Sequence, residues 1–528
     1  PQSILAVLPP WLRHHLRHLH QELDGELYLA GGVVRDLLLG KVPQDIDLTV
    51  SRQAQVWAAR LAELSGGALV PLGRQEDAAR VVAQGLSVDI AAFRQGAAII
   101  AEDLVLRDLT INALAIDLVP LLAEAAASSP ALVLIDPTGG QEDVQHSLIR
   151  LAGPTSLSDD PLRMVRVFRF AATLGFTVEA ATLAQIRTQH HLVTRPAVER
   201  IQHEMDLLLA CGHAAPAVRA MAESGLLGEL LPELMAGQGM AQPASHHLDV
   251  FDHSLAALAA MEQLVATPER WFPQNAALIR DYVARPSMHR RLCWAALLHD
   301  VGKPATFARR ADKNDRITFY QHDQVGVQLV EQITQRYRWS NEDRQAVCLL
   351  IGLHMRPFFL ANDARGGQLS LRACIRLLRK VGEALPGLML LAMADSLAGK
   401  GEARVEDMGR ELAPLSTHLL RVHEAHVAPV QAASPLINGN DLIKCLGLSP
   451  GPIFSTILDA VQEAQMEGQV STVDQALALA HHLATMLRHQ GGVGHQLVGL
   501  VCGVGRLRHG GGQLLHAGCG LLQAGGGL

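Results

Sequence analysis

Two hydrophobic patterns divide the chain. Short apolar runs with strand-like alternation cluster in about the first 140 residues, as in "ELYLAGG", "DIDLTV", "LSVDIAAF" and "NALAIDL". Helical patterns lie between these runs, which predicts a small α/β domain. From about Asp160 onward almost every segment has the helical spacing of apolar residues, with Gly and Pro at the expected helix ends. The sequence therefore predicts an α/β N-terminal domain followed by all-α regions.

The two ends of the chain and one segment near its middle lack the regular apolar spacing of these regions. "PELMAGQGMAQPASHH" is typical of a linker between two helical sections. Residues 489–528 are rich in glycine and low in charge, and they have no period that would build a core. We therefore expect a disordered or aberrant tail. The chain begins at Pro1 without a methionine, so we expect the natural N-terminus to lie upstream.

Composition narrows the class of protein. Hydrophobic residues make up 49% of the 528 residues and aromatic residues only 4%, which favours a largely helical soluble protein. The net charge is -7, so a nucleic-acid partner would need a local basic surface. The 7 cysteines have no CxxC spacing and predict reduced thiols in a cytosolic protein. We find neither an apolar run long enough for a bilayer nor a signal-peptide layout, and we expect a cytoplasmic protein without a membrane partner.

The stretch "YLAGGVVRDLLLGKVPQDIDLTV" is the first candidate for chemistry. On a strand, Asp45 and Asp47 project from one face and offer two hard oxygen ligands that suit Mg²⁺. Flexible and charged positions precede them at the start of a predicted helix: Gly31, Gly32, Arg35 and Asp36. Such glycines let a backbone approach a phosphate closely. A pair of aspartates alone is more often a solvated turn, but the combination favours a metal and triphosphate site.

Two later segments add groups that a nucleotide site needs. In "EDLVLRDLTINALAIDL", Arg107 could bind a triphosphate, and Asp108 and Asn112 could hold a sugar hydroxyl. A capped turn with a surface arginine explains this segment too. In "DDPLRMVRVFRFAATLGF", Asp160 and Arg163 share a helix face and present acceptors and donors in one plane, as the pairing edge of a base requires. Asp160 is also a good helix N-cap.

Several charged positions leave the interpretation open. Three arginines spaced by three predict one basic stripe for phosphates: Arg163, Arg166 and Arg169. In "PAVERIQHEM", Glu199, Arg200 and Glu204 form either a helix-surface ion pair or an active-site brace, and spacing alone does not choose. Asp89 in "LSVDIAAF" either supports the metal site or is an ordinary aspartate at a strand edge.

A second set of metal-ligating residue types lies in the helical middle of the chain. It consists of an adjacent His-Asp pair with a distant histidine and a distant aspartate: His253, His299, Asp300 and Asp395. Imidazole and carboxylate together suit Mn²⁺, Ni²⁺ or a similar divalent ion. The segment resembles HD-domain metal phosphohydrolases. That resemblance implies an HD fold with this ligand set, and His322 and His354 fall where HD proteins can place extra ligands. It leaves open whether the domain hydrolyses a substrate or is a scaffold.

The ordered motifs of the first half resemble class II tRNA nucleotidyltransferases, the CCA-adding enzymes and their relatives, the bacterial poly(A) polymerases. GGVVRD, DID, RDLTINA, DPTGG, DDPLRMVRVFRFA and PAVERI follow one another over roughly residues 25–240. "PLINGNDLIKCLGLSPGP" and the residues after it, to about residue 485, resemble the C-terminal segment of HD-bearing members. The resemblance implies a polymerase-beta-type head, followed by helical neck, body and tail regions that bind the tRNA acceptor stem.

The resemblance also implies roles for individual residues. Asp45 and Asp47 match the catalytic, Mg²⁺-binding carboxylates. The expected nucleotide-binding residues are Gly31, Gly32, Arg35, Asp36, Arg107, Asp108, Asn112, Asp160, Arg163, Arg166, Glu199 and Arg200. Within that set, Asp160 and Arg163 match the pair that reads the base of the incoming CTP or ATP, which would make a nucleic-acid template unnecessary.

Three departures from the family pattern bear on specificity. Leu106 stands where a second arginine usually precedes Asp108, and Asp159 replaces a glutamate. Between "DIAAFR" and "LRDLTINA" there is only "QGAAIIAEDLV", whereas CCA-adding members carry a longer flexible loop that is needed to switch from C to A addition. The short connection resembles the CC-adding enzymes, which leave the final A to a separate A-adding enzyme, and it counts against processive poly(A) synthesis.

We therefore predict a cytoplasmic bacterial tRNA nucleotidyltransferase. The 3′ hydroxyl of tRNA would attack the α-phosphate of CTP or ATP by a two-metal mechanism and release pyrophosphate; we expect C addition, with full CCA synthesis close behind. The same residues are also compatible with a poly(A) polymerase of this family, or with chiefly an HD phosphohydrolase that has an RNA-binding head. The expected regions are a catalytic head (1–150), a helical neck (151–240), an HD-type domain (241–400), a C-terminal helical tRNA-binding region (401–488) and the tail (489–528).

Overall fold

The computed structural model of the chain describes residues 7–23, 25–43, 45–72, 77–122, 133–243, 247–313, 315–399 and 408–489. The predicted glycine-rich tail lies outside these residues except for its first position. The chain forms two compact units, Pro1–Glu424 and Ala425–Leu528.

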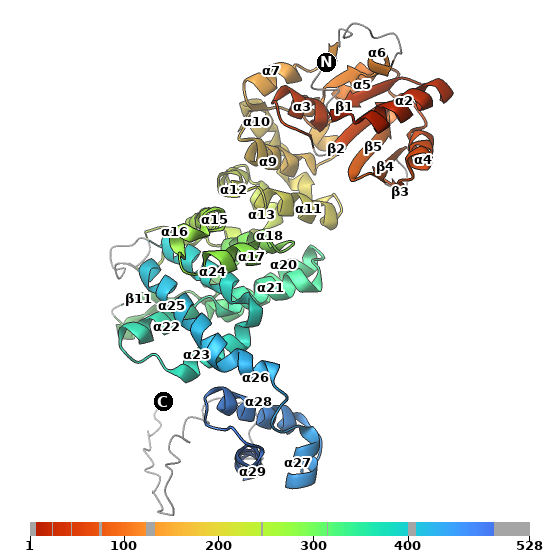
Figure 1. Cartoon of the computed structure of the whole chain (residues 1–528). Coiled ribbons are helices and arrows are strands. Elements are labelled where there is room, and N and C mark those ends of the chain that lie inside the picture. Colours follow the sequence, from red (N-terminus) through yellow and green to blue (C-terminus); the bar gives the residue numbers. More distant parts are fainter. Residues whose placement is uncertain are drawn as a thin grey trace, which may run out of the picture. The chain divides into compact units, whose positions relative to one another are not determined.

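A seven-stranded sheet forms the head (Figure 1). Its strands, in spatial order, are β3 (Ala68–Pro71), β4 (Ala78–Ala83), β5 (Leu86–Ala92), β2 (Asp45–Val50), β1 (Leu27–Ala30), β6 (Ala115–Asp117) and β7 (Leu134–Ile135). Among these described strands β2 and β5 pair in parallel, with Asp47 opposite Asp89, and the other neighbours are antiparallel. The strand that carries the predicted metal ligands therefore lies at the centre of the sheet.

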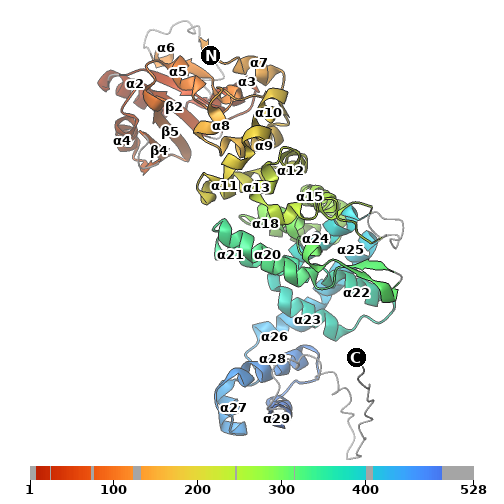
Figure 2. The ribbon, with the colours of Figure 1, turned by 180° about the vertical axis from the view of Figure 1, so that it is seen from behind.

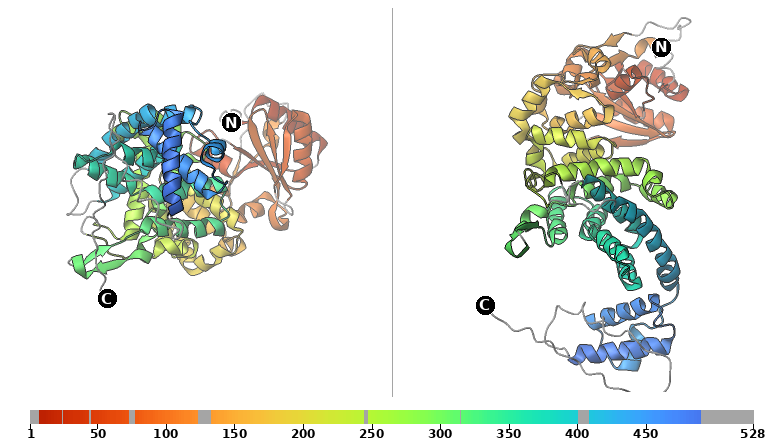
Figure 3. Two further views of the ribbon diagram at one scale, coloured as in Figure 1. Left: turned by 90° about the horizontal axis from the view of Figure 1, so that it is seen from below. Right: turned by 90° about the vertical axis from the view of Figure 1, so that its left-hand side faces the viewer.

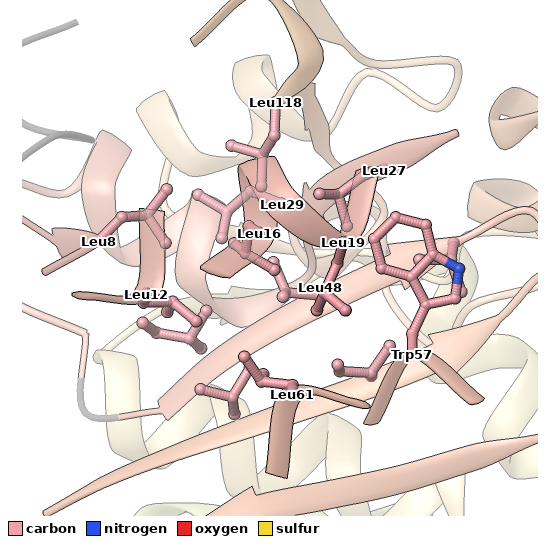
Figure 4. Close-up of a cluster of buried hydrophobic side chains, with 14 of the residues drawn as sticks. Leu8, Leu12, Leu16, Leu19, Leu27, Leu29, Leu48, Trp57, Leu61 and Leu118 are labelled. Carbon is pink, nitrogen blue, oxygen red and sulfur yellow. The ribbon is translucent and has the colours of Figure 1, made fainter. Parts of the chain in front are cut away.

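The apolar positions of β2 explain where its aspartates point. Helices α2 (Pro10–Glu22) and α4 (Ala54–Ser65) cover one face of the sheet, and a leucine-rich core with Trp57 fills the space beneath them (Figure 4). Alternate residues of β2 belong to this core: Ile46, Leu48 and Val50. Because side chains alternate along a strand, Asp45 and Asp47 project from the opposite face. Each fully buried leucine there contributes on the order of 2 kcal/mol, so a one-residue slip of register would be costly.

Short helices surround the open face of the sheet and position its loops. They are α3 (Gly32–Leu38), α5 (Ile100–Val105), α7 (Gly140–Gln145) and the 3-10 turns η1 (Arg94–Gly96) and η2 (Thr110–Asn112). Helix α6 (Val119–Leu122) packs instead on α2 at the covered face. Helix α7 packs on η2 so closely that a Cβ atom on Gly140 would lie 2.1 Å from the carbonyl oxygen of Thr110. The second glycine of the DPTGG motif therefore fixes the turn that carries Asn112.

The neck helices lie between the head and the HD-type helices (Figures 2 and 3). They are α8 (Ser156–Asp159), α9 (Arg163–Leu174), α10 (Ala180–Gln189), η3 (His190–Thr194), α11 (Val198–Leu209), α12 (Ala214–Glu223), α13 (Leu226–Leu230) and α14 (Pro232–Met235), with β8 (Leu148–Ile149) paired to β9 (Thr177–Val178). Helix α11 contacts both α9 of the neck and α18 of the next region. Helix α12 likewise contacts α9 and, in the next region, α15, so two neck helices join the regions.

The HD-type region is helical around one apolar helix, α24. Its elements are α15 (Val250–Ala266), α16 (Pro268–Trp271), α17 (Ala276–Val283), α18 (Met288–Leu298), α19 (Lys303–Thr306), β10 (Ala308–Arg310), η4 (Ala311–Lys313), β11 (Arg316–Thr318), α20 (His322–Arg336), α21 (Asn341–Leu353), α22 (Arg356–Arg365), α23 (Leu371–Val381), η5 (Gly382–Ala384), α24 (Leu385–Ala398) and α25 (Met408–Val422). Among the described residues, one stretch, Leu371–Ala398, has the length and hydropathy of a membrane span. Its most apolar window is 67% buried inside the structure, as in a core helix of a soluble protein.

The second unit is a small helical bundle. It contains α26 (Ala428–Ala432), α27 (Gly439–Leu446), α28 (Pro452–Met466) and α29 (Val473–His489), and a turn of π-helix (His423–Val427) leads into it. A capping box between Asn438 and Asp441 starts α27. Helix α25 packs on α22, α23 and α24, and the chain therefore divides into units after Glu424. The sequence analysis placed a domain boundary at 400. The predicted domain limits themselves stay predictions.

Candidate active site and metal centre

A cavity of about 480 Å³ lies between the head and the neck. Most of the predicted nucleotide-site residues line it: Gly31, Gly32, Arg35, Asp47, Arg107, Asp108, Asn112, Asp160, Arg163, Arg166 and Arg200. Three predicted residues do not. Asp36 accepts hydrogen bonds from Arg35, Asp45 is exposed at the start of β2, and Glu199 forms an ion pair with Arg338.

Asp47 is a carboxylate in the cavity whose negative charge a cation would stabilise. Its side chain is half-buried, lines the cavity and has no hydrogen-bond partner among the described residues. Burial, followed by repulsion from Asp89, raises the pKa of Asp47 to about 6. A divalent ion shared with Asp45, two residues away on the same strand face, would remove both penalties. The residues present therefore fit the expected metal.

Asp89 is occupied by a partner on the neighbouring strand. Arg80 of β4 lies opposite Asp89 and donates two hydrogen bonds to its carboxylate, at 2.6 and 2.8 Å. Asp89 lines the cavity as well. Asp89 thus faces the expected metal site, as the first interpretation required, and it is also paired with an arginine.

Arg107 lies behind the glycine turn. It is 9% exposed and donates to the carboxylate of Asp103 at 3.2 Å and to the hydroxyl of Thr49 at 2.9 Å. Burial lowers the pKa of Arg107 to about 10, which still leaves it charged at neutral pH. Gly31 has φ +93, and a Cβ atom there would lie 2.9 Å from Nη1 of Arg107, so this turn requires glycine twice over.

Asp108 and Asn112 are held in one hydrogen-bonded group. One oxygen of Asp108 accepts from the Leu109 amide at 2.8 Å and from the Asn112 side chain at 3.1 Å, and its other oxygen accepts twice from Arg166. Although burial opposes it, Arg166 with these hydrogen bonds holds the pKa of Asp108 far below its usual range. Asn112 accepts in turn from Arg35 at 2.6 Å. The group presents fixed polar atoms to the cavity.

Asp160 and Arg163 both line the cavity, but each is hydrogen-bonded to other residues. Asp160 has an extended backbone and precedes α9, so it does not share a helix face with Arg163. Arg200 donates to Asp160 at 2.7 Å, and Arg163 donates to the carbonyl oxygens of Leu106 and Arg107 at 2.8 and 3.2 Å. The expected base-reading pair is therefore held by separate partners in this structure.

The predicted basic stripe is divided by a buried acid. Arg166 and Arg169 both donate to Glu204 of α11, at 2.9 and 2.5 Å, whereas Arg163 turns toward the segment before Asp108. For the PAVERIQHEM segment, the structure favours a brace over a pair within the helix, because Glu204 contacts α9 and Glu199 contacts Arg338. Sequence reasoning missed a second brace, Asp103, which is buried and binds Arg94 and Arg107; only its position one turn before Arg107 hints at it.

The His-Asp residues form a second centre with one end of α15, α18 and α24 each contributing. His253, His299 and Asp395 can direct one ligand atom each to a common point. Nε2 of His253 lies 3.1 Å from Asp395 and 3.4 Å from Asp300. His299 donates from Nδ1 to the Ala296 carbonyl, and its buried Nε2 faces the carboxylates of Asp300 at 3.2 Å and Asp395 at 3.8 Å.

A second trio adjoins the first through the HD aspartate. It consists of Asp300, His322 and His354. Both of these histidines donate from Nδ1 to a backbone carbonyl, and their Nε2 atoms face each other at 3.1 Å. Two lone pairs at this distance repel unless a cation lies between them. Burial and the neighbouring histidines lower the pKa of His354 to about 4, so this imidazole is neutral at pH 7 and can offer Nε2 to a metal ion.

Comparison with known proteins places these centres in a family. Four family models match: the poly A polymerase head domain (27–150), the probable RNA and SrmB-binding site of polymerase A (175–237), the HD domain (250–399) and a putative tRNA nucleotidyltransferase domain 2 (415–480). An A-adding tRNA nucleotidyltransferase of Deinococcus radiodurans is 35% identical over 86% of this chain and 95% of its own. The chain belongs to the tRNA nucleotidyltransferase family.

Two further matches are consistent with this membership. A CC-adding tRNA nucleotidyltransferase of Thermus thermophilus is 31% identical over 86% of this chain and 92% of its own. The structure of a Thermotoga maritima CCA-adding enzyme with tRNA matches the fold with a TM-score of 0.55 at 20% identity, over 92% of this chain and 98% of that one. The predicted fold class and nucleotidyltransferase activity of this family member are confirmed. Its head and HD domains imply the use of divalent metal ions.

Proposed function

We propose that this tRNA nucleotidyltransferase extends the 3′ end of tRNA with nucleotides taken from CTP or ATP, in the cavity between head and neck. The observation that carries the proposal is the gathering there of Asp47, the glycine turn and the Asp108–Asn112 group, from segments far apart in sequence. The acceptor stem is the expected RNA partner.

Each group has a part that follows from its surroundings. Asp45 and Asp47 would hold Mg²⁺, which when bound lowers the pKa of the attacking hydroxyl and neutralises charge on the leaving pyrophosphate. Arg107 is positively charged and fixed beside the glycine turn, where backbone and guanidinium can bind the triphosphate. Asp108 and Asn112 offer an acceptor and a donor for the ribose hydroxyls. Asp160 offers an acceptor for the exocyclic amine that cytosine and adenine share.

We further propose that the enzyme makes only one part of the CCA end. Strand β5 and helix α5 are joined by residues 93–99 alone, which contain the single turn η1. A connection this short leaves little chain for the rearrangement between C and A addition. C addition is the activity that the sequence favoured. A addition is a second candidate, since identity to the Deinococcus A-adding enzyme is 35% against 31% to the Thermus CC-adding enzyme over nearly the same span.

Three tRNA transcripts test both proposals. They end at the discriminator base, at CC and at CCA, and each is incubated with labelled CTP or ATP. C addition to the first transcript alone identifies a CC-adding enzyme, and A addition to the second alone an A-adding enzyme. Addition of all three nucleotides refutes the specialist proposal, and ATP-dependent extension of unstructured RNA would indicate a poly(A) polymerase. Asp47→Asn should abolish addition in every case, whereas His299→Ala should not affect it.

A second activity is favoured by the metal centre. We propose that the HD domain hydrolyses a phosphoester with divalent ions such as Mn²⁺ or Ni²⁺, held by both trios of ligands. Lys303 lies beside Asp300 and donates to Gln242 at 2.7 Å, which places a cation next to the centre for a phosphate oxygen. Phosphatase and cyclic phosphodiesterase assays with each metal test this proposal. His299→Ala and His322→Ala should each abolish phosphoester hydrolysis and lower the metal content, because each removes a ligand from one trio, while nucleotide addition continues.

A further inference from the structure

We propose that Glu204 is a positioning residue for nucleotide addition: it holds Arg166 against Asp108 and so fixes the carboxylate expected to bind the ribose. The inference rests on the proposed function of the head–neck cavity. Glu204 itself does not line that cavity. It would act on the substrate only through the arginine.

The contacts form a continuous chain from the neck to the head. Glu204 is 5% exposed and accepts from Nη1 of Arg166 at 2.9 Å and from Nε of Arg169 at 2.5 Å. The remaining donors of Arg166, Nε and Nη2, reach one oxygen of Asp108 at 2.9 and 2.6 Å. A guanidinium with both of its edges occupied has no freedom to rotate, so Glu204 sets the plane that Asp108 meets.

From Asp108 the chain continues to the glycine helix. The other oxygen of Asp108 accepts from Asn112, Asn112 accepts from Arg35, and Arg35 donates to Asp36. Each residue thus has one partner nearer the neck and one nearer the glycine turn. Asp108, Asn112 and Arg166 line the cavity, while Glu204 is buried and does not line it.

Charge balance makes Glu204 necessary for this arrangement. Two arginines, Arg166 and Arg169, face two carboxylates, Glu204 and Asp108. Without the charge of Glu204, Arg166 and Arg169 would compete for Asp108 as their nearest anion. We expect Asp108 then to turn away from the ribose position.

Helix α11 supplies a matched control, Asp206. It lies two residues beyond Glu204, is also buried, and accepts from Trp294 at 2.7 Å and from Arg290 at 3.1 Å. Those partners belong to α18 and its start, away from the nucleotide cavity. Asp206→Asn therefore removes an equally buried charge from the same helix without changing the hydrogen bonds that link Glu204, Arg166 and Asp108.

The experiment measures discrimination between ribose and deoxyribose. For the wild type, Glu204→Gln, Glu204→Asp and Asp206→Asn, kcat/KM is determined with CTP and dCTP, or with ATP and dATP, on a tRNA transcript that accepts that nucleotide. We expect Glu204→Gln to lower the ribonucleotide preference by about tenfold, as for loss of one charge-assisted hydrogen bond. Glu204→Asp should recover part of the preference, and Asp206→Asn should leave it unchanged.

A double-mutant cycle separates this inference from a general loss of stability. If Glu204 acts through Asp108, Glu204→Gln should cost little further preference in an Asp108→Asn background. Thermal unfolding of each variant shows whether it is folded at the assay temperature. An unchanged sugar preference in folded Glu204→Gln, with a wild type that does discriminate, would overturn the inference. Absence of nucleotide addition by the wild type would instead refute the proposed function.

Discussion

Gly302 lies where the two halves of the metal centre meet, and replacing it with alanine gives a sharp prediction. The residue follows the His299–Asp300 pair and packs against the start of α20. Its φ of -81 is ordinary, so glycine is not needed for the backbone conformation. A Cβ atom would, however, lie 2.1 Å from the carbonyl oxygen of His322 and 2.5 Å from the amide nitrogen of Gly326.

The size of the required movement follows from these distances. Ordinary van der Waals contact begins at 3.4 Å, so the His322 carbonyl must move by about 1.3 Å, the difference between 3.4 and 2.1 Å. Metal ligation tolerates errors of only about 0.2 Å. Because the same residue supplies the imidazole of the second trio, that trio should lose its geometry. The first trio, on α15, α18 and α24, should keep its own.

The assay compares metal content and stability in the full chain. After loading with Mn²⁺ and desalting, Gly302→Ala should hold less metal than the wild type while retaining some. Overpacking should lower the free energy of unfolding by about 1–3 kcal/mol, measured by urea denaturation. Nucleotide addition should continue at the wild-type rate, because the head is not involved.

Gly326→Ala is the matched control on the other side of the same contact. Its Cβ atom would meet Ile351 at 3.5 Å and the Gly302 nitrogen at 3.6 Å, both ordinary contacts. We expect unchanged metal content. Wild-type metal content and stability in Gly302→Ala would refute the steric reasoning. Equal losses in the two variants would show that α20 tolerates no added volume, whatever the distance.

Three further predictions concern the head. Asp47 has a pKa of about 6 instead of 3.8, so it should bind metal less tightly as pH falls below about 6, which titration calorimetry at several pH values would show. In the metal-free protein the same shift should lower the free energy of unfolding as pH rises from about 4 to 6, with no further effect above pH 6. Denaturation at several pH values would show this second effect. Asp103→Asn should cost about 3–5 kcal/mol in urea denaturation, since it leaves buried Arg107 without its anion, and an unchanged midpoint would contradict this. Gly140→Ala should raise the KM for the nucleotide by displacing the Thr110 turn, whereas alanine at Gly153, where the Cβ would meet the Val105 carbonyl at 3.0 Å, should have a smaller effect.

Local patterns were enough to predict much of the head and the residues that gather into the two His-Asp trios. The alternation of "DIDLTV" placed both aspartates opposite the core, and the glycine turn and the Arg107 segment meet in one cavity. What failed was an assumption about helix limits. Asp160 and Arg163 are three residues apart, but α9 begins only at Arg163, so the helical geometry that would bring them together is absent.

Partners distant in sequence were beyond the reach of spacing. Glu204 allowed two interpretations because its partners lie on another helix, 35 and 38 residues earlier. Asp103 attracted no attention, although burial and two arginines make it a brace of the site. In both cases the position of the acid depends on how helices pack. Packing depends on the whole core and not on any motif.

The Asp108–Arg166 contact also has a consequence for how the protein is made. The two residues are 58 positions apart, and Glu204 follows 38 positions after Arg166. A ribosome adds residues at about 5–20 per second, so a newly emerged head waits several seconds for its neck. During that interval Asp108 lacks the Arg166 guanidinium that holds its carboxylate in place. The nascent head should therefore stay inert toward nucleotides, and become competent only when the neck has been synthesised.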